Sequence, residues 1–382
     1  MTTAETTTAL SDGAQLALDT VHQRAVQGIP SKGINVMEHA ILERVAGAEP
    51  GAYRSKPEKT YLAFQKAAGA CVIDQWIPRN PLGMGDKGFA GGPRGATTGL
   101  EQIVVDERLI DSPEAVAAHL EEVALPRLER AAASFDEDAR VAEILAKEAE
   151  VQALFGGSIL KTGYQFVKFP KMRYGAYGYE NYFMAYALYP DVIERHFARQ
   201  ADVALLNNAA AARAYAEGAL PPLYRLDHDM ADGRGTLVDI ASLDRIWFPH
   251  FARCLAPMLK TDVRMIWHCD GNLMEMVPRL IEAGVRGFQG FQYEHGMDYK
   301  RICAMKDRNG DKLIIQAGVS VTTTLPHGTA RDVGDQMKWL VENGPRTGLF
   351  LGCSSSVAPG VPWENIETLI EGFKYYQQHG RS

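Results

Sequence analysis

The sequence contains no run of eighteen or more apolar residues, so it lacks the segment that a membrane-spanning helix requires. Its first residues, Met-Thr-Thr-Ala-Glu-Thr-Thr-Thr, also lack the basic and apolar stretches of a secretory signal. We therefore expect a cytoplasmic protein that is soluble and has no membrane partner.

Cysteine is scarce, and basic clusters are absent. The five cysteines form an odd, widely spaced set, unlike the dense even framework of a small secreted domain, so we expect reduced thiols. The net charge of -7 is spread along the chain, and no group of Lys or Arg suggests a surface for nucleic acid. A polyanionic partner is therefore not expected.

The sequence does contain enough apolar residues to form one large core, since they make up 46% of its 382 residues. In the C-terminal half, β-rich runs alternate with helical patterns, as in βα units with a parallel sheet. The predicted strands are 263–268, 286–291, 312–317 and 348–352, and the predicted helices are 273–283, 299–307, 331–342 and 363–379. The segment 111–150, rich in Ala, Glu and Leu, is also predicted to be helical.

A (β/α)8 TIM barrel explains this pattern better than an open sheet, because no Gly-x-Gly-x-x-Gly follows a strand and because polar residues follow several different strands. These residues are Asp227, His268 to Asp270, Gln292 and Glu294, Gly318 to Thr324, and Cys353 to Ser356. We expect residues 1–35 to form an N-terminal arm or short helix and 36–382 to form a single barrel domain. The glycine-rich segment 79–99 is predicted to be a loop that covers the site.

The segment His268-Cys269-Asp270-Gly271 is the centre of the candidate site. Side chains alternate along a strand, so His268 and Asp270 share a side and Cys269 points to the other. If Cys353 reaches the same rim, imidazole, carboxylate and thiolate provide three ligands for an open zinc site. The alternative is structural, because buried Cys is common in cores and a His at a strand end often only bonds a carboxylate.

Three other segments supply candidates. The stretch 227–235 offers Asp227 or Asp229 for proton transfer and Arg234 for orienting an anionic group, although Asp and Gly also simply form turns. The aromatic segment 174–182 offers Tyr177 and Glu180 as part of a substrate wall, although a packed surface loop is the more common structure. Gln292, at another predicted strand exit, is a further candidate for substrate binding.

The last two hundred or so residues resemble the uroporphyrinogen decarboxylase superfamily, whose members share a barrel of this kind. The matching motifs are Gly178-Tyr179-Glu180-Asn181, Asp229-Met230-Ala231-Asp232-Gly233-Arg234-Gly235, Ile266-Trp267-His268-Cys269-Asp270-Gly271-Asn272, Leu325-Pro326-His327-Gly328-Thr329 and Ala358-Pro359-Gly360-Val361-Pro362-Trp363-Glu364-Asn365. The N-terminal half matches only in general layout.

Two chemistries occur in that superfamily. Its haem-pathway decarboxylases carry the motif Met-Arg-Gln-Ala-Gly-Arg for the carboxylates of their substrate, and the first hundred residues lack it. Its corrinoid-linked methyltransferases carry His-x-Cys and a distant Cys that hold zinc. Here His268 matches that His, Asp270 replaces the first Cys, and Cys353 lies two residues before the expected second Cys, where Ser355 stands.

The resemblance implies a methyltransferase in which His268, Asp270 and Cys353 bind zinc and a cobalamin-type or tetrahydrofolate-type carrier brings the methyl group. The expected partners are a small-molecule substrate and a corrinoid carrier protein, and a homodimer is compatible with the sequence. One alternative is a metal-free decarboxylase of a small or macrocyclic acid, with Asp229 and His268 as acid and base. Another is a barrel that only binds a corrinoid or its carrier protein.

Overall fold

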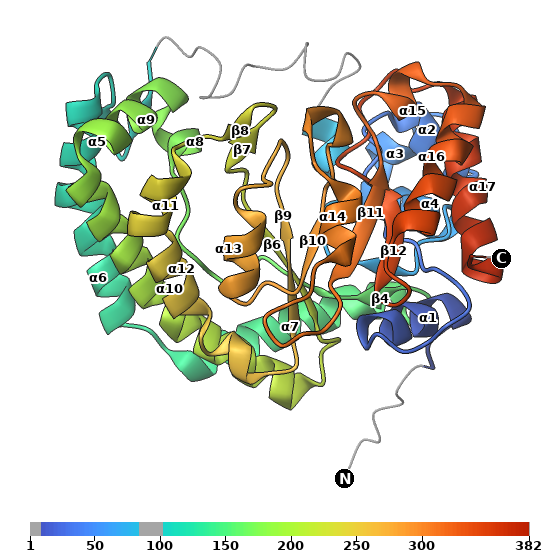
Figure 1. The fold of residues 1–382 in the computed structure, drawn as a ribbon, viewed down its shortest axis with the longest axis horizontal. Coiled ribbons are helices and arrows are strands. Elements are labelled where there is room, and N and C mark those ends of the chain that lie inside the picture. The colour runs from blue at the N-terminus through green and yellow to red at the C-terminus, as the bar shows by residue number, and fades with distance from the viewer. Residues whose placement is uncertain (1–8, 84–101, 382) are drawn as a thin grey trace.

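The architecture is that of a mixed α/β protein with a curled parallel sheet (Figure 1). The computed structural model describes residues 9–83 and 102–381. Most of the glycine-rich segment predicted to cover the site, from residue 84 onward, lies outside them.

The central sheet has six strands in the order β12-β11-β10-β9-β6-β5, and every neighbouring pair is parallel. The strands are β5 (Gly163–Tyr164), β6 (Leu223–Asp227), β9 (Arg264–His268), β10 (Gly287–Gln289), β11 (Ile314–Val319) and β12 (Leu349–Cys353). Asp227 pairs with His268, so β6 and β9 end at the same level. Residues that follow these two strands are therefore brought side by side.

Pairing continues beyond this sheet through short segments. β1 (Val72–Ile73) pairs with β4 (Leu160–Lys161), and only Thr162 separates β4 from β5. Isolated parallel bridges join Ser31 to Leu351 of β12 and Lys32 to Val72 of β1. Residues 31 and 32, which lie in the segment expected to form an N-terminal arm, thus pair with strands on both sides.

Helix α1 (Asp12–Val21) closes the N-terminal end of the strands. The side chain of Ser11 caps it by accepting the Ala14 N–H, and its Ala14, Ala17 and Val21 are fully buried. They share an apolar cluster with residues in the N-terminal parts of several strands, namely Val72, Leu160, Leu223, Ile266, Ile314 and Phe350. Because this end is apolar and closed, polar groups in the sheet interior gather at the other end.

Helices flank the sheet on both sides and pack apolar faces against it (Figure 1). The segment 111–150 is helical as predicted. The principal helices are α2 (His39–Ala46), α4 (Pro57–Ala67), α5 (Pro113–His119), α6 (Leu125–Ala133), α7 (Glu137–Phe155), α9 (Tyr179–Leu188), α10 (Pro190–Gly218), α11 (Ile240–Ile246), α12 (Phe248–Leu255), α13 (Val277–Glu282), α14 (Tyr299–Ala304), α16 (Ala330–Asn343) and α17 (Trp363–His379).

The predicted strands and helices of the C-terminal half are all present, with shifted ends. The helix expected from residue 273 starts only at Val277, with Pro278 in its first turn, because a turn occupies residues 274–276. All five cysteines are buried and free. Among residues 9–83 and 102–381, no helix has the length and apolar character needed to cross a bilayer.

Candidate active site at the strand ends

The ends of β6 and β9 bring four acidic or basic side chains together, namely Asp227, Asp229, His268 and Asp270. The Asp270 N–H donates to Asp229 Oδ1 at 3.0 Å, which ties the two exit segments to each other. The next N–H, of Gly271, donates to Gln292 Oε1 at 2.8 Å. Gln292 therefore holds the backbone of this loop rather than facing a ligand.

Asp229, His268 and Asp270 form a group able to hold a metal ion, with ligand atoms all within 4.8 Å of one another. His268 Nε2 and Asp270 Oδ1 are 4.0 Å apart. Asp270 Oδ1 is buried and makes no hydrogen bond, and His268 Nε2 is the ring nitrogen that lies near it. Because buried polar atoms are normally paired, this oxygen, beside an imidazole nitrogen and the Asp229 carboxylate, fits a divalent cation with nitrogen and oxygen ligands.

Cys353 does not belong to this group, although it lines the same cavity. Burial raises the pKa of its thiol to about 12, and the nearby charge of Lys32 only partly opposes this effect. Ser355, two residues later, instead donates its hydroxyl to Asp270 Oδ2 at 3.2 Å. The structure thus places Asp229 where the sequence suggested the sulfur, while Cys269 packs in the core, away from the site, as expected.

The cavity at these strand ends has a volume of about 240 Å³. Its charged lining comprises four carboxylates and two basic side chains, namely Asp74, Asp227, Asp229 and Asp270 against Lys32 and Arg225. A surplus of two negative charges in a small cavity is electrostatically matched by one divalent cation. The volume lies below the roughly 300 Å³ that drug-sized ligands require, so a small substrate group fits.

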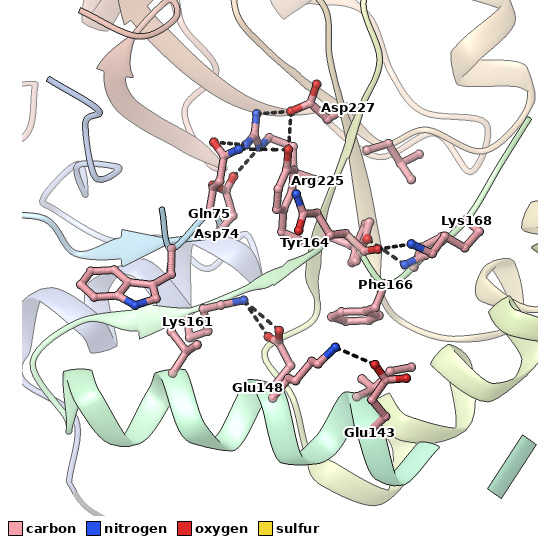
Figure 2. A pocket seen from close by; sticks show the side chains of 18 of the residues that line it. Asp74, Gln75, Glu143, Glu148, Lys161, Tyr164, Phe166, Lys168, Arg225 and Asp227 are labelled. Carbon is pink, nitrogen blue, oxygen red and sulfur yellow. Dashed lines mark hydrogen bonds and ion pairs between the residues drawn. The ribbon is translucent and has the colours of Figure 1, made fainter. Parts of the chain in front are cut away.

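A buried ion-pair network forms the floor of the cavity and was not anticipated from the sequence. Arg225 Nε lies 2.8 Å from Asp74 Oδ2, and Arg225 Nη1 lies 3.0 Å from Asp227 Oδ2. Lys32 Nζ lies 3.1 Å from the same Asp74 oxygen. Figure 2 shows Arg225 between the two carboxylates, with Tyr164 donating its hydroxyl to Asp227 at 2.8 Å. The sequence signal that could have identified Asp74 and Arg225 is a single charged residue within an apolar run, Cys-Val-Ile-Asp and Leu-Tyr-Arg-Leu.

The network sets the protonation of its members. Burial alone raises the pKa of Asp74, but Arg225 and Lys32 outweigh it and hold that pKa below its ordinary value. Burial, with help from Arg225, lowers the pKa of Lys32 to about 8, against the opposing effect of Asp74. Asp74 therefore stays ionised, and Lys32 is a titratable group of the cavity that the sequence analysis did not single out.

A second, larger cavity of about 610 Å³ adjoins the first (Figure 2). The two share part of their lining, namely Asp74, Gln75, Ile77, Arg225 and Asp227. The larger cavity extends from there to α7, where Lys161 Nζ pairs with Glu148 Oε2 at 2.8 Å. The ion-pair network is thus the boundary between two adjoining spaces.

The fold is similar to that of a methyltransferase from Methanosarcina mazei. The two structures superpose with a TM-score of 0.57 over 95% of this chain and 98% of the other, at 16% sequence identity. At this identity the similarity concerns the fold alone. No family model matches the chain, and no curated protein matches its sequence.

All four predicted substrate residues lie outside both cavities: Gln292, described above, and Arg234, Tyr177 and Glu180. Arg234 is exposed and pairs with Asp232 at 2.8 Å within its own hairpin, so Arg225 and not Arg234 is the arginine at the site. Tyr177 is buried, and its hydroxyl bonds to His119 Nδ1 at 2.9 Å. Glu180 is exposed in the first turn of α9. The aromatic segment forms α8 (Tyr174–Tyr177) and the start of α9, where the favoured interpretation had been a packed surface loop.

Two carboxylates of the site, Asp227 and Asp270, differ in environment. Asp227 is mostly buried, and burial raises its pKa, but His268, Arg225 and the Tyr164 hydroxyl together bring the pKa below its ordinary value. Burial raises the pKa of Asp270, with Asp229 adding to the effect and His268 opposing it. Asp227 is therefore an anion that pairs with Arg225, whereas burial opposes the ionisation of Asp270.

Gly290 makes room for the His268 ring, so Gly290→Ala should disturb the site. Gly290 has φ +80°, and an added Cβ would lie 2.4 Å from His268 Nδ1. Gly360, at φ +95° with nothing within 4 Å of such a Cβ, is the matched control. We expect Gly360→Ala to cost about 1–2 kcal/mol for the left-handed backbone, and Gly290→Ala to cost more.

Denaturant unfolding of both variants measures the difference, and a zinc titration reports on the ring position. Equal losses of unfolding free energy, with unchanged zinc affinity in both, would contradict the assigned role of Gly290.

Proposed function

We propose that this protein is a metal-assisted methyltransferase that acts on a small substrate at the C-terminal ends of its strands. The observation that carries the proposal is the group of Asp229, His268 and Asp270 in a small cavity with surplus negative charge. The similarity of fold to a methyltransferase supports the same reaction class. We propose zinc as the ion, because imidazole and carboxylate are ligands that zinc accepts.

In this proposal the three side chains hold the ion and their neighbours orient them. Ser355 donates to Asp270, and Gln292 fixes the loop that carries it. When bound, zinc acts as a Lewis acid that makes the methyl acceptor more nucleophilic. Lys32 Nζ takes up or returns the proton of the acceptor, since its pKa of about 8 lets both forms exist near neutral pH.

The carrier of the methyl group is proposed to be a corrinoid or a pterin. A tetrapyrrole-sized ring exceeds a cavity of about 240 Å³, so a corrinoid would present its methyl group at the cavity mouth, held by a separate carrier protein. The same volume argues against a macrocyclic acid as substrate. Surplus negative charge at Asp229 and Asp270 also repels a carboxylate, which disfavours the metal-free decarboxylase.

We also propose that the strands close into the full eight-membered barrel. The segments that support closure are Ser31–Lys32, β1, and β4 with β5, which together connect β12 to β6. The Lys32 N–H donates to Leu351 O at 2.7 Å, and the Gly33 N–H donates to Val72 O at 2.8 Å. Such a barrel gathers the residues of all strand exits at one rim.

The deciding experiment combines metal analysis with a methyl-transfer assay. The purified full chain should bind about one equivalent of zinc and, with candidate acceptors, change the absorption spectrum of added methylcobalamin. Transfer from a methylated pterin is followed in parallel by product analysis. Carbon dioxide release without zinc would favour the decarboxylase instead. Zinc below about a tenth of an equivalent, with no recovery on soaking, would refute the metal-assisted mechanism.

A further inference from the structure

The larger cavity opens where two strands separate. β1 and β4 pair through Val72 and Ile73, and the last backbone hydrogen bond between their segments runs from the Thr162 N–H to Ile73 O at 3.0 Å. Among the described residues, no backbone hydrogen bond joins the continuing segments, 74–77 and 164–169. Both segments line the cavity of about 610 Å³. The space is therefore a gap in the sheet wall that reaches the ion-pair network of the small cavity.

The charged lining of this cavity has a positive surplus, opposite to that of its neighbour. Six cations face four carboxylates: Arg140, Lys147, Lys161, Lys168, Lys171 and Arg225 against Asp74, Glu143, Glu148 and Asp227. The four carboxylates are all engaged by four of these cations, as Figure 2 shows for several of them. Lys168 and Lys171 account for the surplus.

Within the part of the chain that the structure describes, these two lysines donate to backbone oxygens. Lys168 Nζ donates to Gln165 O at 2.8 Å, and Lys171 Nζ donates to Asp227 O at 2.9 Å. Burial lowers the pKa of both; repulsion from Arg140 and Lys171 adds to the effect at Lys168, and attraction to Asp227 and Asp229 opposes it at Lys171. An ammonium group has three donors, so each retains hydrogen-bonding capacity for an anion.

Helix α10 holds the backbone that carries the two lysines. Asn208 accepts the Lys168 N–H at 2.8 Å and donates to Lys168 O at 2.8 Å. Gln200 does the same for Lys171, at 3.0 and 3.2 Å. These two amide clamps fix the lysine backbones in place before any ligand arrives, which reduces the entropy cost of binding.

From this arrangement we infer that the larger cavity is a binding site for an anionic group, a carboxylate or a phosphate, held by Lys168 and Lys171. The assignment of that anion to the methyl-transfer co-substrate rests on the proposed function. A molecule anchored there would extend toward Arg225 and Asp227, which line both cavities. The anion would thus bind in the larger cavity, whose surplus positive charge attracts it. It would lie apart from the group of Asp229, His268 and Asp270 in the smaller cavity.

Calorimetric titration of the full chain with inorganic phosphate and with succinate, at low ionic strength and without metal or methyl donor, tests the inference. We expect one of the two anions to bind, and which one binds identifies the group. Lys168→Gln with Lys171→Gln should weaken binding by about tenfold or more. Both side chains are exposed enough for the variant to fold, which a thermal unfolding scan checks.

Lys338→Gln is the control, because Lys338 is exposed on α16 and lies outside both cavities. Its affinity for the anion should equal that of the unchanged protein. Equal weakening in the control and the double variant, or no binding of either anion to the unchanged protein, would overturn the inference. Since no methyl transfer is measured, either result leaves the proposed reaction to its own test.

Discussion

Replacing Asp74 with asparagine is expected to lower the free energy of unfolding by about 3–5 kcal/mol, the usual cost of removing one partner from a buried ion pair. Asp74 is 4% exposed and faces two cations, Arg225 Nε at 2.8 Å and Lys32 Nζ at 3.1 Å. Asp227 still neutralises Arg225 in the variant. Lys32 loses its carboxylate partner at Asp74, so its pKa should fall further below its ordinary value.

Chemical denaturation at pH 7 measures this loss, and Asp335→Asn provides the matched control. Asp335 pairs with Arg331 at 3.5 Å, but both side chains are largely exposed, at 69% and 89%. Such a surface pair contributes about 0–1 kcal/mol, so this variant should unfold almost like the unchanged protein. If Asp74→Asn lowered the free energy of unfolding no more than Asp335→Asn does, the buried ion-pair network would not stabilise the fold.

Asp229→Asn is expected to weaken zinc binding by at least about 100-fold, whereas Cys353→Ser should leave it nearly unchanged. The reason is geometric, since the ligand atoms of Asp229, His268 and Asp270 lie within 4.8 Å of one another and the sulfur of Cys353 is outside this group. Changes to groups that only orient metal ligands already cost about 10–100-fold, and loss of a ligand costs at least as much. His268→Gln should match Asp229→Asn.

Competition with a chromophoric zinc chelator measures the affinities of the three variants. The two substitutions at 229 and 353 conserve size, so unfolding midpoints serve to exclude a general loss of structure. A large effect of Cys353→Ser with none from Asp229→Asn would restore the His268, Asp270 and Cys353 set that the sequence suggested. No effect from any variant would remove the metal centre altogether.

The alternation of strands and helices in the C-terminal half was readable because it depends on local patterns. Val263–His268 was predicted as a strand and is β9 from Arg264, and the last helix, Trp363–His379, has its predicted bounds. The N-terminal half was harder. Its strands β1, β4 and β5 have two residues each, too few to show a period, and residues 31–32 pair only through isolated bridges.

The relative placement of candidate residues could be predicted where a single strand exit carries them. His268 and Asp270 share a side, as alternation requires, and Cys269 faces the core. Arg234 was chosen for its position in a charged segment, yet it pairs locally and is exposed. The arginine that lines the cavities is Arg225, a charged residue inside a buried strand, which the sequence analysis did not recognise as a candidate.

The sequence by itself determined the α/β alternation, the parallel strands and the presence of an imidazole and a carboxylate at the end of β9. Only the tertiary structure decided that Asp229 joins them, that Lys32, Asp74 and Arg225 form one buried network, and that two cavities of opposite charge meet there. The physical reason is that periodicity fixes which side of its own strand a residue faces. Which residues meet across strands depends instead on register and on how the sheet curls, which no single segment encodes.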